Sequence, residues 1–217
     1  MKRDFAGHAL LQILVHLAGA LPLLWLVMDF FTANLTANPI QAIEQRTGLT
    51  AVSFLAASLA CTPLAWLTGW KNLTQRRKAL GNYGFFYAAL HLLTFFILDY
   101  GLDFAAIWGD VGKKAYILIG AAAFLLLLPL AVTSFNYWMK RLGKNWKRLH
   151  RLVYIISPLV VLHFFMAKKG DFLRLSGDIL QPLAFAALVA LLLILRLPPV
   201  KQALLQLKSK ITRGAAV

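Results

Sequence analysis

The segment AYILIGAAAFLLLLPLAVTSF, residues 115–135, is an apolar run that contains no charged residue. A helix needs about 20 such residues to cross the hydrocarbon core of a bilayer, because each residue advances the helix axis by about 1.5 Å. Five other runs have the same character, so the sequence predicts an all-α integral membrane protein built as a six-transmembrane-helix bundle. The expected spans are residues 6–28, 50–68, 79–98, 115–135, 152–167 and 179–197.

The composition supports this class and excludes others. Of the 217 residues, 60% are hydrophobic and 14% are charged, yet the net charge is +15. A soluble domain has about 25% charged residues, and a nucleic-acid binder carries its cations on one face of an ordinary core. We therefore expect a lipid bilayer around the chain and no nucleic-acid partner. The single cysteine, Cys61, excludes an internal disulfide and a cysteine-ligated iron–sulfur cluster.

The distribution of charge predicts the orientation. If the N-terminus is cytoplasmic, 17 of the 23 basic residues and one of the eight acidic residues fall in cytoplasmic segments, which gives +16 inside and −1 outside. Cytoplasmic segments are enriched in Lys and Arg, so both termini are expected in the cytoplasm. We expect residues 1–197 to form the membrane domain and residues 198–217 a basic amphipathic tail on the inner leaflet. Asn38, Pro39 and Gly48 predict a separate short helix over residues 39–47 on the outer surface.

Two histidines are the candidate metal ligands. His91 lies about 18 Å and His163 about 17 Å from the inner ends of their expected spans, at the rise of a helix. Histidine within a span is costly and is a functional hypothesis by default, and a bis-histidine haem needs one imidazole from each of two facing helices. The alternative is two buried histidines that bond to neighbouring helices. His16, at about 15 Å, is an alternative ligand or a polar packing residue.

The inner face holds a second group of candidates. His150 precedes His163 by 13 residues, or about 20 Å of helix, which would suit a second haem. The position 13 residues before His91 is Lys78, which is no usual haem ligand, so His150 is also a candidate contact for a haem propionate, a flavin or a quinone. Cations can hold a phosphate or propionate and a tryptophan can stack on a flavin, although anionic lipid headgroups are the alternative partners. The candidate residues are Arg77, Arg141, Lys144 and Trp146.

Several short motifs occur together along nearly the whole chain. They are His16-Leu17-Ala18-Gly19, Thr62-Pro63-Leu64-Ala65, Arg76-Arg77 with Leu80-Gly81, Leu90-His91-Leu92, Arg141-Leu142-Gly143-Lys144 with Trp146, Leu149-His150 and His163-Phe164. In combination they resemble the MsrQ family, haem-binding membrane subunits of the bacterial periplasmic methionine sulfoxide reductase system, within the ferric-reductase-like transmembrane group.

The resemblance implies a multi-pass protein of the bacterial inner membrane. It implies that His91 and His163 are the axial ligands of a b-type haem and that His150 is a further functional histidine. It also implies FMN as a second cofactor. The implied partner is a periplasmic molybdopterin-containing catalytic subunit, which reduces oxidised methionine in proteins.

The expected electron donor is a separate molecule. About 20 residues follow the last expected span and the chain contains no Gly-x-Gly-x-x-Gly fingerprint, so it is not expected to oxidise NAD(P)H itself. Membrane quinol or a cytosolic flavin reductase would supply the electrons. We find no sulfoxide-reducing centre and assign no catalytic residue, so we expect an electron-transfer subunit. The alternatives are a stand-alone transmembrane ferric or metal reductase and a cofactor-free small-molecule transporter, which the lack of intramembrane acidic residues disfavours.

Overall fold

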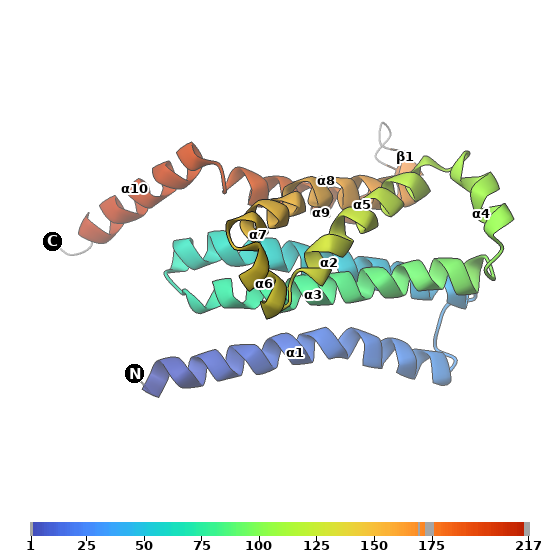
Figure 1. The fold of residues 1–217 in the computed structure, drawn as a ribbon, viewed down its shortest axis with the longest axis horizontal. Coiled ribbons are helices and arrows are strands. Elements are labelled where there is room, and N and C mark those ends of the chain that lie inside the picture. Colours follow the sequence, from blue (N-terminus) through green and yellow to red (C-terminus); the bar gives the residue numbers. More distant parts are fainter. Residues whose placement is uncertain (1, 169, 172–175, 215–217) are drawn as a thin grey trace.

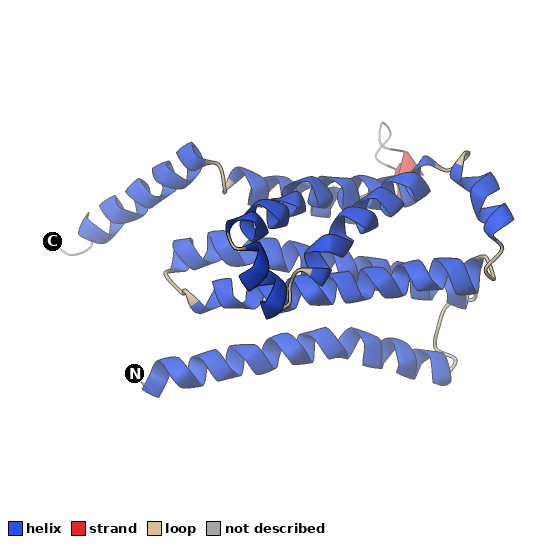
Figure 2. Ribbon diagram, in the orientation of Figure 1, coloured by secondary structure: helices blue, strands red, loops and turns tan. Residues whose placement is uncertain are grey.

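The computed structural model describes residues 2–168, 170–171 and 176–214, and these residues are almost entirely helical (Figures 1 and 2). The predicted all-α class is confirmed, apart from one antiparallel pair of two-residue strands. The elements are α1 (Lys2–Phe31), α2 (Pro39–Thr68), α3 (Asn72–Leu93), the π-helix η1 (Thr94–Asp99), α4 (Phe104–Val111), α5 (Ala115–Val132), α6 (Asn136–Leu142), α7 (Lys144–Leu149), the 3₁₀-helix η2 (His150–Leu152), α8 (Val153–Ala167), β1 (Gly170–Asp171), β2 (Ser176–Gly177), α9 (Leu180–Ile194) and α10 (Pro198–Gly214).

Five helical segments are long and apolar enough to cross a membrane, which confirms a multi-pass architecture. The sixth expected span, residues 179–197, is present as α9, which has 15 residues and is therefore shorter than the roughly 20 residues that a bilayer requires. An 80° bend joins it to α10, and only the bent pair together makes a sixth candidate. The five segments are Ala9–Phe31, Pro39–Thr68, Asn72–Asp99, Ala115–Val132 and Lys144–Ala167.

The long helices run side by side and alternate in direction (Figure 1). The helices α2 and α3 pack against each other along their length, α5 packs on α8, and α8 packs on α9. The start of α1, the α6–α7 segment and α10 all lie toward the same side of the bundle, on the left in Figure 1, and we call this side the basic end. The other end, which carries α4 and the β1–β2 strands, is called the opposite end.

The helix α2 corrects one expectation from the sequence. It begins as predicted, because the Asn38 side chain accepts a hydrogen bond from the Gln41 backbone N–H (3.1 Å) and Pro39 occupies its first turn. The helix does not stop at Gly48, so the prediction of a separate helix over residues 39–47 is wrong. It runs on to Thr68 because the apolar span follows without a break. A glycine within a helix costs only about 1 kcal/mol.

The core lies between α2 and its neighbours. Leu55, Leu127 and Ile156 form one buried cluster from α2, α5 and α8, and Phe54 and Tyr87 join α2 to α3 in a second cluster. Many large apolar side chains on α1 are exposed, as expected for a helix that faces lipid rather than water.

The predicted tail is helical from Pro198 to Gly214. The ammonium of Lys208 donates a hydrogen bond to the Leu67 carbonyl (2.6 Å), which attaches α10 to the end of α2. The last tail residues, 215–217, lie outside the described residues. So do two of the expected outer cations, Lys169 and Arg174.

Candidate haem site

The structure brings His91 on α3 and His163 on α8 together. Their ring centroids are 6.1 Å apart and their planes are inclined by 75°. Each histidine belongs to a different packed pair of helices, because α3 packs on α2 and α8 packs on α5. The two rings therefore meet at the junction between two helix pairs.

Both imidazoles are held by the same kind of hydrogen bond. The Nδ1 atom of His91 is 2.9 Å from the Glu44 carbonyl oxygen, and the Nδ1 atom of His163 is 2.8 Å from the Tyr116 carbonyl oxygen. A carbonyl oxygen only accepts, so each Nδ1 carries the hydrogen and donates it. The Nε2 atom of each neutral ring then keeps a free lone pair. Metal-ligating histidines are normally oriented in this way, by donation of the other ring N–H.

A glycine lies against each ring. A Cβ atom at Gly48 would be 3.2 Å from Nδ1 of His91, and one at Gly120 would be 2.7 Å from Nδ1 and Cε1 of His163. Each glycine follows the accepting residue by four positions, which is about one helical turn. In both halves the histidine also follows the residue whose carbonyl it contacts by 47 positions.

The two half-sites are therefore alike. The sequence analysis did not predict the four supporting residues. The sequence contains a signal for the two glycines, because each of them precedes one of the paired histidines by 43 residues. The missed residues are Glu44, Gly48, Tyr116 and Gly120.

The pair fits the requirements of a haem. Two imidazoles on opposite sides of a metal, each bound at about 2 Å, have ring centroids roughly 6 Å apart, and the observed separation is 6.1 Å. Among the described residues, no three or more His, Cys, Asp or Glu side chains cluster as they would to hold a bare metal ion. A donor set of two facing histidines is instead the set that holds a haem in a helical bundle.

His16 has a different partner. Its Nδ1 atom is 2.9 Å from the hydroxyl of Tyr83, and the two rings are arranged edge to face. Tyr83 precedes His91 by eight residues on α3, or about 12 Å along the axis. The structure thus places His16 in contact with α3 but not with the His91–His163 pair.

His150 lies on η2 at the basic end, where Trp146 covers it. The two rings are stacked with centroids 4.0 Å apart, and the Trp146 indole N–H donates to the Thr133 carbonyl (2.8 Å). The Thr133 hydroxyl donates to the Pro129 carbonyl (2.6 Å) and lies 3.1 Å from Nε2 of His150. Because that hydroxyl has only one hydrogen, it accepts from the His150 Nε2–H. The Nε2 atom of His150 is therefore engaged, and the ring is fixed against the end of α5.

The cations predicted to lie at the inner face make different contacts in the structure. Lys144 lies in a hollow of about 540 Å³. Arg141 instead donates to the Tyr137 hydroxyl (2.6 Å) and lies 5.6 Å from the centre of the Trp138 ring. Arg77 lies on α3, where its backbone carbonyl accepts a hydrogen bond from the Ser58 hydroxyl (2.9 Å). The residues that line the hollow are Gly143, Lys144, Lys147, Arg148 and Arg151.

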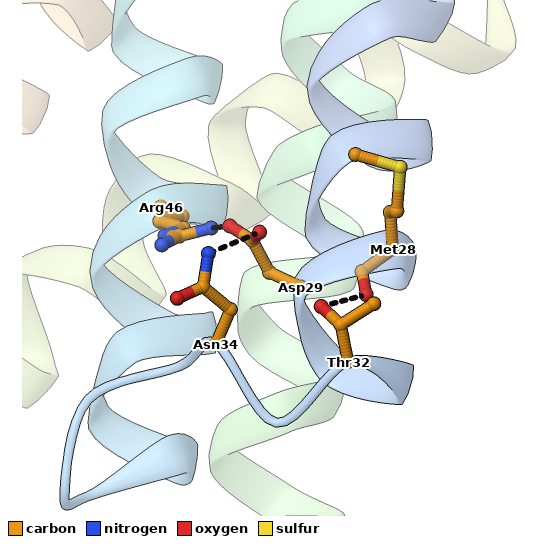
Figure 3. Close-up of polar contacts among 5 residues, drawn as sticks. All are labelled: Met28, Asp29, Thr32, Asn34 and Arg46. Carbon is orange, nitrogen blue, oxygen red and sulfur yellow. Dashed lines mark hydrogen bonds and ion pairs between the residues drawn. The ribbon is translucent and has the colours of Figure 1, made fainter.

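An ion pair at the opposite end joins α1 to α2 (Figure 3). The Arg46 guanidinium pairs with the carboxylate of Asp29, whose side chain is 6% exposed, and the Asn34 amide contacts the same carboxylate (3.4 Å). Arg46 follows Glu44, whose carbonyl contacts His91, by two residues on α2. The sequence analysis did not predict this contact.

Comparison with known proteins shows which family has a similar sequence. Residues 47–162 match the family model described as the ferric reductase like transmembrane component. The chain is 45% identical over 189 residues to the protein-methionine-sulfoxide reductase heme-binding subunit MsrQ of Rhodospirillum rubrum, covering 87% of this chain and 88% of the relative. It is 42% identical to the MsrQ protein of Herminiimonas arsenicoxydans, with 86% and 84% covered. It is 40% identical to that of Polaromonas naphthalenivorans, with 88% and 86% covered.

Proposed function

The chain belongs to the MsrQ family of haem-binding subunits of protein-methionine-sulfoxide reductase, a ferric-reductase-like transmembrane family, and on that premise we propose that it carries electrons across the inner membrane. The proposed cofactor is a b-type haem held by His91 and His163. The proposed acceptor is the periplasmic molybdopterin-containing catalytic subunit, which uses the electrons to repair oxidised methionine in proteins. Residues 1–197 form the haem-binding membrane domain in this proposal, and residues 198–217 form its cytoplasmic tail.

The observation that carries this proposal is the matched pair of histidines, whose rings are 6.1 Å apart. Each donates its Nδ1–H to a carbonyl oxygen, which leaves Nε2 as the metal-binding atom. A haem in this position supplies reversible one-electron chemistry. The protein's part is to hold both imidazoles in fixed orientations and to surround them with packed helices that exclude water.

The position of the pair supports the direction of transfer. His163 is four residues from the end of α8 at Ala167, and His91 is eight residues from Asp99, where the continuous segment of α3 and η1 ends. Both lie toward the opposite end of the bundle. If the basic end faces the cytoplasm, as the charge distribution favours, this haem lies in the periplasmic half. Asp99 and Asp103 at that end are candidate contacts for the catalytic subunit.

The donor side is proposed at the basic end. Either membrane quinol or a cytosolic flavin reductase delivers the electrons. FMN is the proposed second cofactor, and the cationic hollow that contains Lys144 suits its phosphate, because Lys and Arg bind phosphate by charge-assisted hydrogen bonds. Trp146 and His150 form a stacked pair at this end. We assign Arg77 and Arg141 to the same cofactor region, for which a second haem is the alternative to FMN.

The experiment that tests the proposal uses the purified full-length protein. We expect a low-spin haem spectrum and reoxidation of the reduced haem when the catalytic subunit and a methionine-sulfoxide protein are added together. Reoxidation by soluble ferric chelates but not by the catalytic subunit would instead indicate a stand-alone metal reductase. A protein that binds no haem when haem is in ample supply would contradict both functions and leave the transporter alternative.

A further inference from the structure

A groove lies between α1 and α3 in the half of the bundle nearer the basic end. Its volume is about 490 Å³, which is within the range of small-molecule binding sites. Both helices start at the basic end and run in the same direction (Figure 1). Both also belong to segments that are long and apolar enough to cross a membrane, so a molecule dissolved in the bilayer can reach the groove directly.

Two cations line the groove. The Lys78 side chain is exposed, and among the described residues its ammonium donates one hydrogen bond, to the Asn136 side chain on α6 (3.1 Å). An ammonium has three donors, so two remain for a ligand. Arg76 also lines the groove, and none of the described lining residues is acidic. The groove therefore presents positive charge to a molecule that enters it.

Neutral polar groups lie about one helical turn farther from the basic end. Asn82 follows Lys78 by four residues on α3, and His16 follows Gln12 by four residues on α1, which is about 6 Å of helix in each case. Asn82 and His16 are exposed, and within the described part of the chain the Asn82 side chain forms no hydrogen bond. The Nδ1 atom of His16 is 2.9 Å from the Tyr83 hydroxyl, which leaves its Nε2 atom for a ligand. Polar side chains exposed on membrane-crossing helices are costly and indicate a functional site.

Beyond these polar groups α1 and α3 are in direct contact. Gly19 on α1 has no side chain, and the Tyr83 ring occupies the space that a Cβ atom would need. The Tyr87 hydroxyl donates to the Gly19 carbonyl (2.7 Å) and accepts from the Leu23 N–H (3.0 Å). The exposed ring of Phe86 provides an apolar wall of the groove. The groove is thus a wedge between the two helices, closed at the level of Gly19.

The order of these groups along the helices matches the order of groups in a phospholipid. A phosphate is anionic and binds Lys and Arg through charge-assisted hydrogen bonds. The glycerol ester carbonyls lie deeper in the leaflet and accept hydrogen bonds, and the acyl chains are apolar. Basic pockets between membrane helices on the cytoplasmic side bind anionic lipid headgroups. A soluble anion would use the cations but not the deeper polar groups, and a neutral lipid-soluble molecule would leave the cations unused.

We propose that the α1–α3 groove binds one anionic phospholipid of the leaflet at the basic end. Its phosphate contacts the Lys78 ammonium near Arg76, its ester carbonyls accept hydrogen bonds from Asn82 and His16, and its acyl chains pass Phe86 into the bilayer. The lipid fills the wedge and joins the first half of α1 to α3. This role concerns the attachment of α1 and does not depend on the proposed electron-transfer function.

The test uses haem-loaded full-length protein, purified in detergent and washed free of lipid. The probes are phosphatidylglycerol and phosphatidylcholine with identical acyl chains, and native mass spectrometry gives the Kd of each. We expect one tightly bound phosphatidylglycerol and roughly tenfold weaker phosphatidylcholine, because the choline cation is repelled by Lys78. Lys78→Gln should raise the Kd of phosphatidylglycerol roughly tenfold and abolish the preference, because it removes a charge-assisted hydrogen bond. Lys201→Gln, which changes an exposed lysine of α10, is the matched control and should leave both Kd values unchanged.

Asn82→Leu tests the ester level separately. Both lipids have the same ester carbonyls, so this variant should raise both Kd values by a similar factor, about fivefold for one neutral hydrogen bond. The preference for phosphatidylglycerol should remain. The haem spectrum of every variant should match that of the wild-type protein, which shows that the bundle is folded.

Three results would each overturn the lipid site. One is an unchanged Kd of phosphatidylglycerol in both Lys78→Gln and Asn82→Leu. Another is equally effective displacement of the lipid by glycerol phosphate, which would indicate a site for a soluble anion. The third is displacement by an equal concentration of a benzoquinone with a ten-carbon tail, which would indicate a neutral ligand. A normal haem spectrum beside any of them would leave the proposed function intact, whereas failure of the wild-type protein to bind haem would contradict that function without changing the lipid Kd values.

Discussion

Gly120 lies so close to the imidazole of His163 that a Cβ atom at that position would be 2.7 Å from the ring. Real Cβ contacts essentially never reach this distance, so the ring or the helix would have to move. We therefore predict that Gly120→Ala weakens haem binding by about 10–100-fold, the usual effect of disturbing a residue that supports a metal ligand. Titration of the apo-protein with haem, followed by the Soret absorbance, measures this effect.

Gly48 allows the same test with a smaller expected effect on haem binding. A Cβ atom there would be 3.2 Å from His91, a tight contact that a shift of a few tenths of an ångström relieves. Gly48→Ala should weaken haem binding by less than Gly120→Ala does. Gly109→Ala is the control because, apart from its chain neighbours and the nearby backbone of its own helix, no atom of the described residues lies within 4 Å of its Cβ position. Equal haem affinity in all three variants would show that the glycines do not position the histidines.

Replacement of either paired histidine should abolish the low-spin haem spectrum. We expect His91→Ala and His163→Ala each to lose one axial bond to iron, and added imidazole to restore part of the spectrum by occupying the vacated position. His16→Ala should retain the wild-type spectrum, because the structure places His16 against Tyr83 rather than against the pair. A normal spectrum in both His91→Ala and His163→Ala would refute the ligand assignment.

The paired histidines and their partners show how much of the candidate haem site can be predicted from the sequence. The depth of a histidine follows from counting residues along a span, so His91 and His163 were predicted from the sequence. Their partners, Glu44 and Tyr116, contribute backbone carbonyls, and every residue has one. No side-chain pattern therefore marks them, and only the packing of α3 on α2 and of α8 on α5 reveals which carbonyl is used.

The boundary of α2 was mispredicted for a related reason. Gly48 was interpreted as the end of a helix because glycine is enriched there, but it is needed inside the helix to admit the His91 ring. The length of α9 was also overestimated, because the apolar run continues to Leu197 while the helix ends at Ile194. Local composition does not determine where a bend interrupts an apolar run.

The cofactor assignment at the basic end can be tested through His150. We predict that His150→Ala leaves the haem bound by His91 and His163 unchanged but lowers the content of the second cofactor, FMN or a second haem. The measurement is the ratio of FMN and of haem to protein after purification. Trp146→Phe removes the hydrogen bond to Thr133 but keeps a ring to stack, so it should have a smaller effect. If both ratios match the wild-type values in both variants, neither side chain contributes to a cofactor site.

The ion pair between Asp29 and Arg46 should contribute to the stability of the bundle. Arg46→Gln leaves the buried Asp29 carboxylate without its cation, and an unpaired buried charge is destabilising. We expect a lower Tm in detergent, because the ion pair holds α1 to α2. The double variant Asp29→Asn with Arg46→Gln should recover part of the Tm, because it removes both charges together. Additive losses of Tm would show that the two residues do not interact.

The proposed orientation predicts which end of the molecule an impermeant thiol reagent can reach. In a Cys61→Ala background, Lys147→Cys at the basic end should be labelled only after the membrane is permeabilised. Lys113→Cys at the opposite end should be labelled in cells whose inner membrane is intact. The reverse pattern would invert the topology and would place the paired histidines nearer the cytoplasm.

The two half-sites also affect how fast an electron can move. Both imidazoles are oriented by bonds to backbone carbonyls and by contacts with glycine, none of which involves the iron. We therefore expect neither imidazole to turn, nor its bond to the iron to change much in length, when the iron changes charge. The protein dipoles around them are likewise already in place before the electron arrives, as in a preorganised site. The repeated carbonyl and glycine arrangement thus predicts a low reorganisation energy, which is the property that a rapid one-electron relay requires.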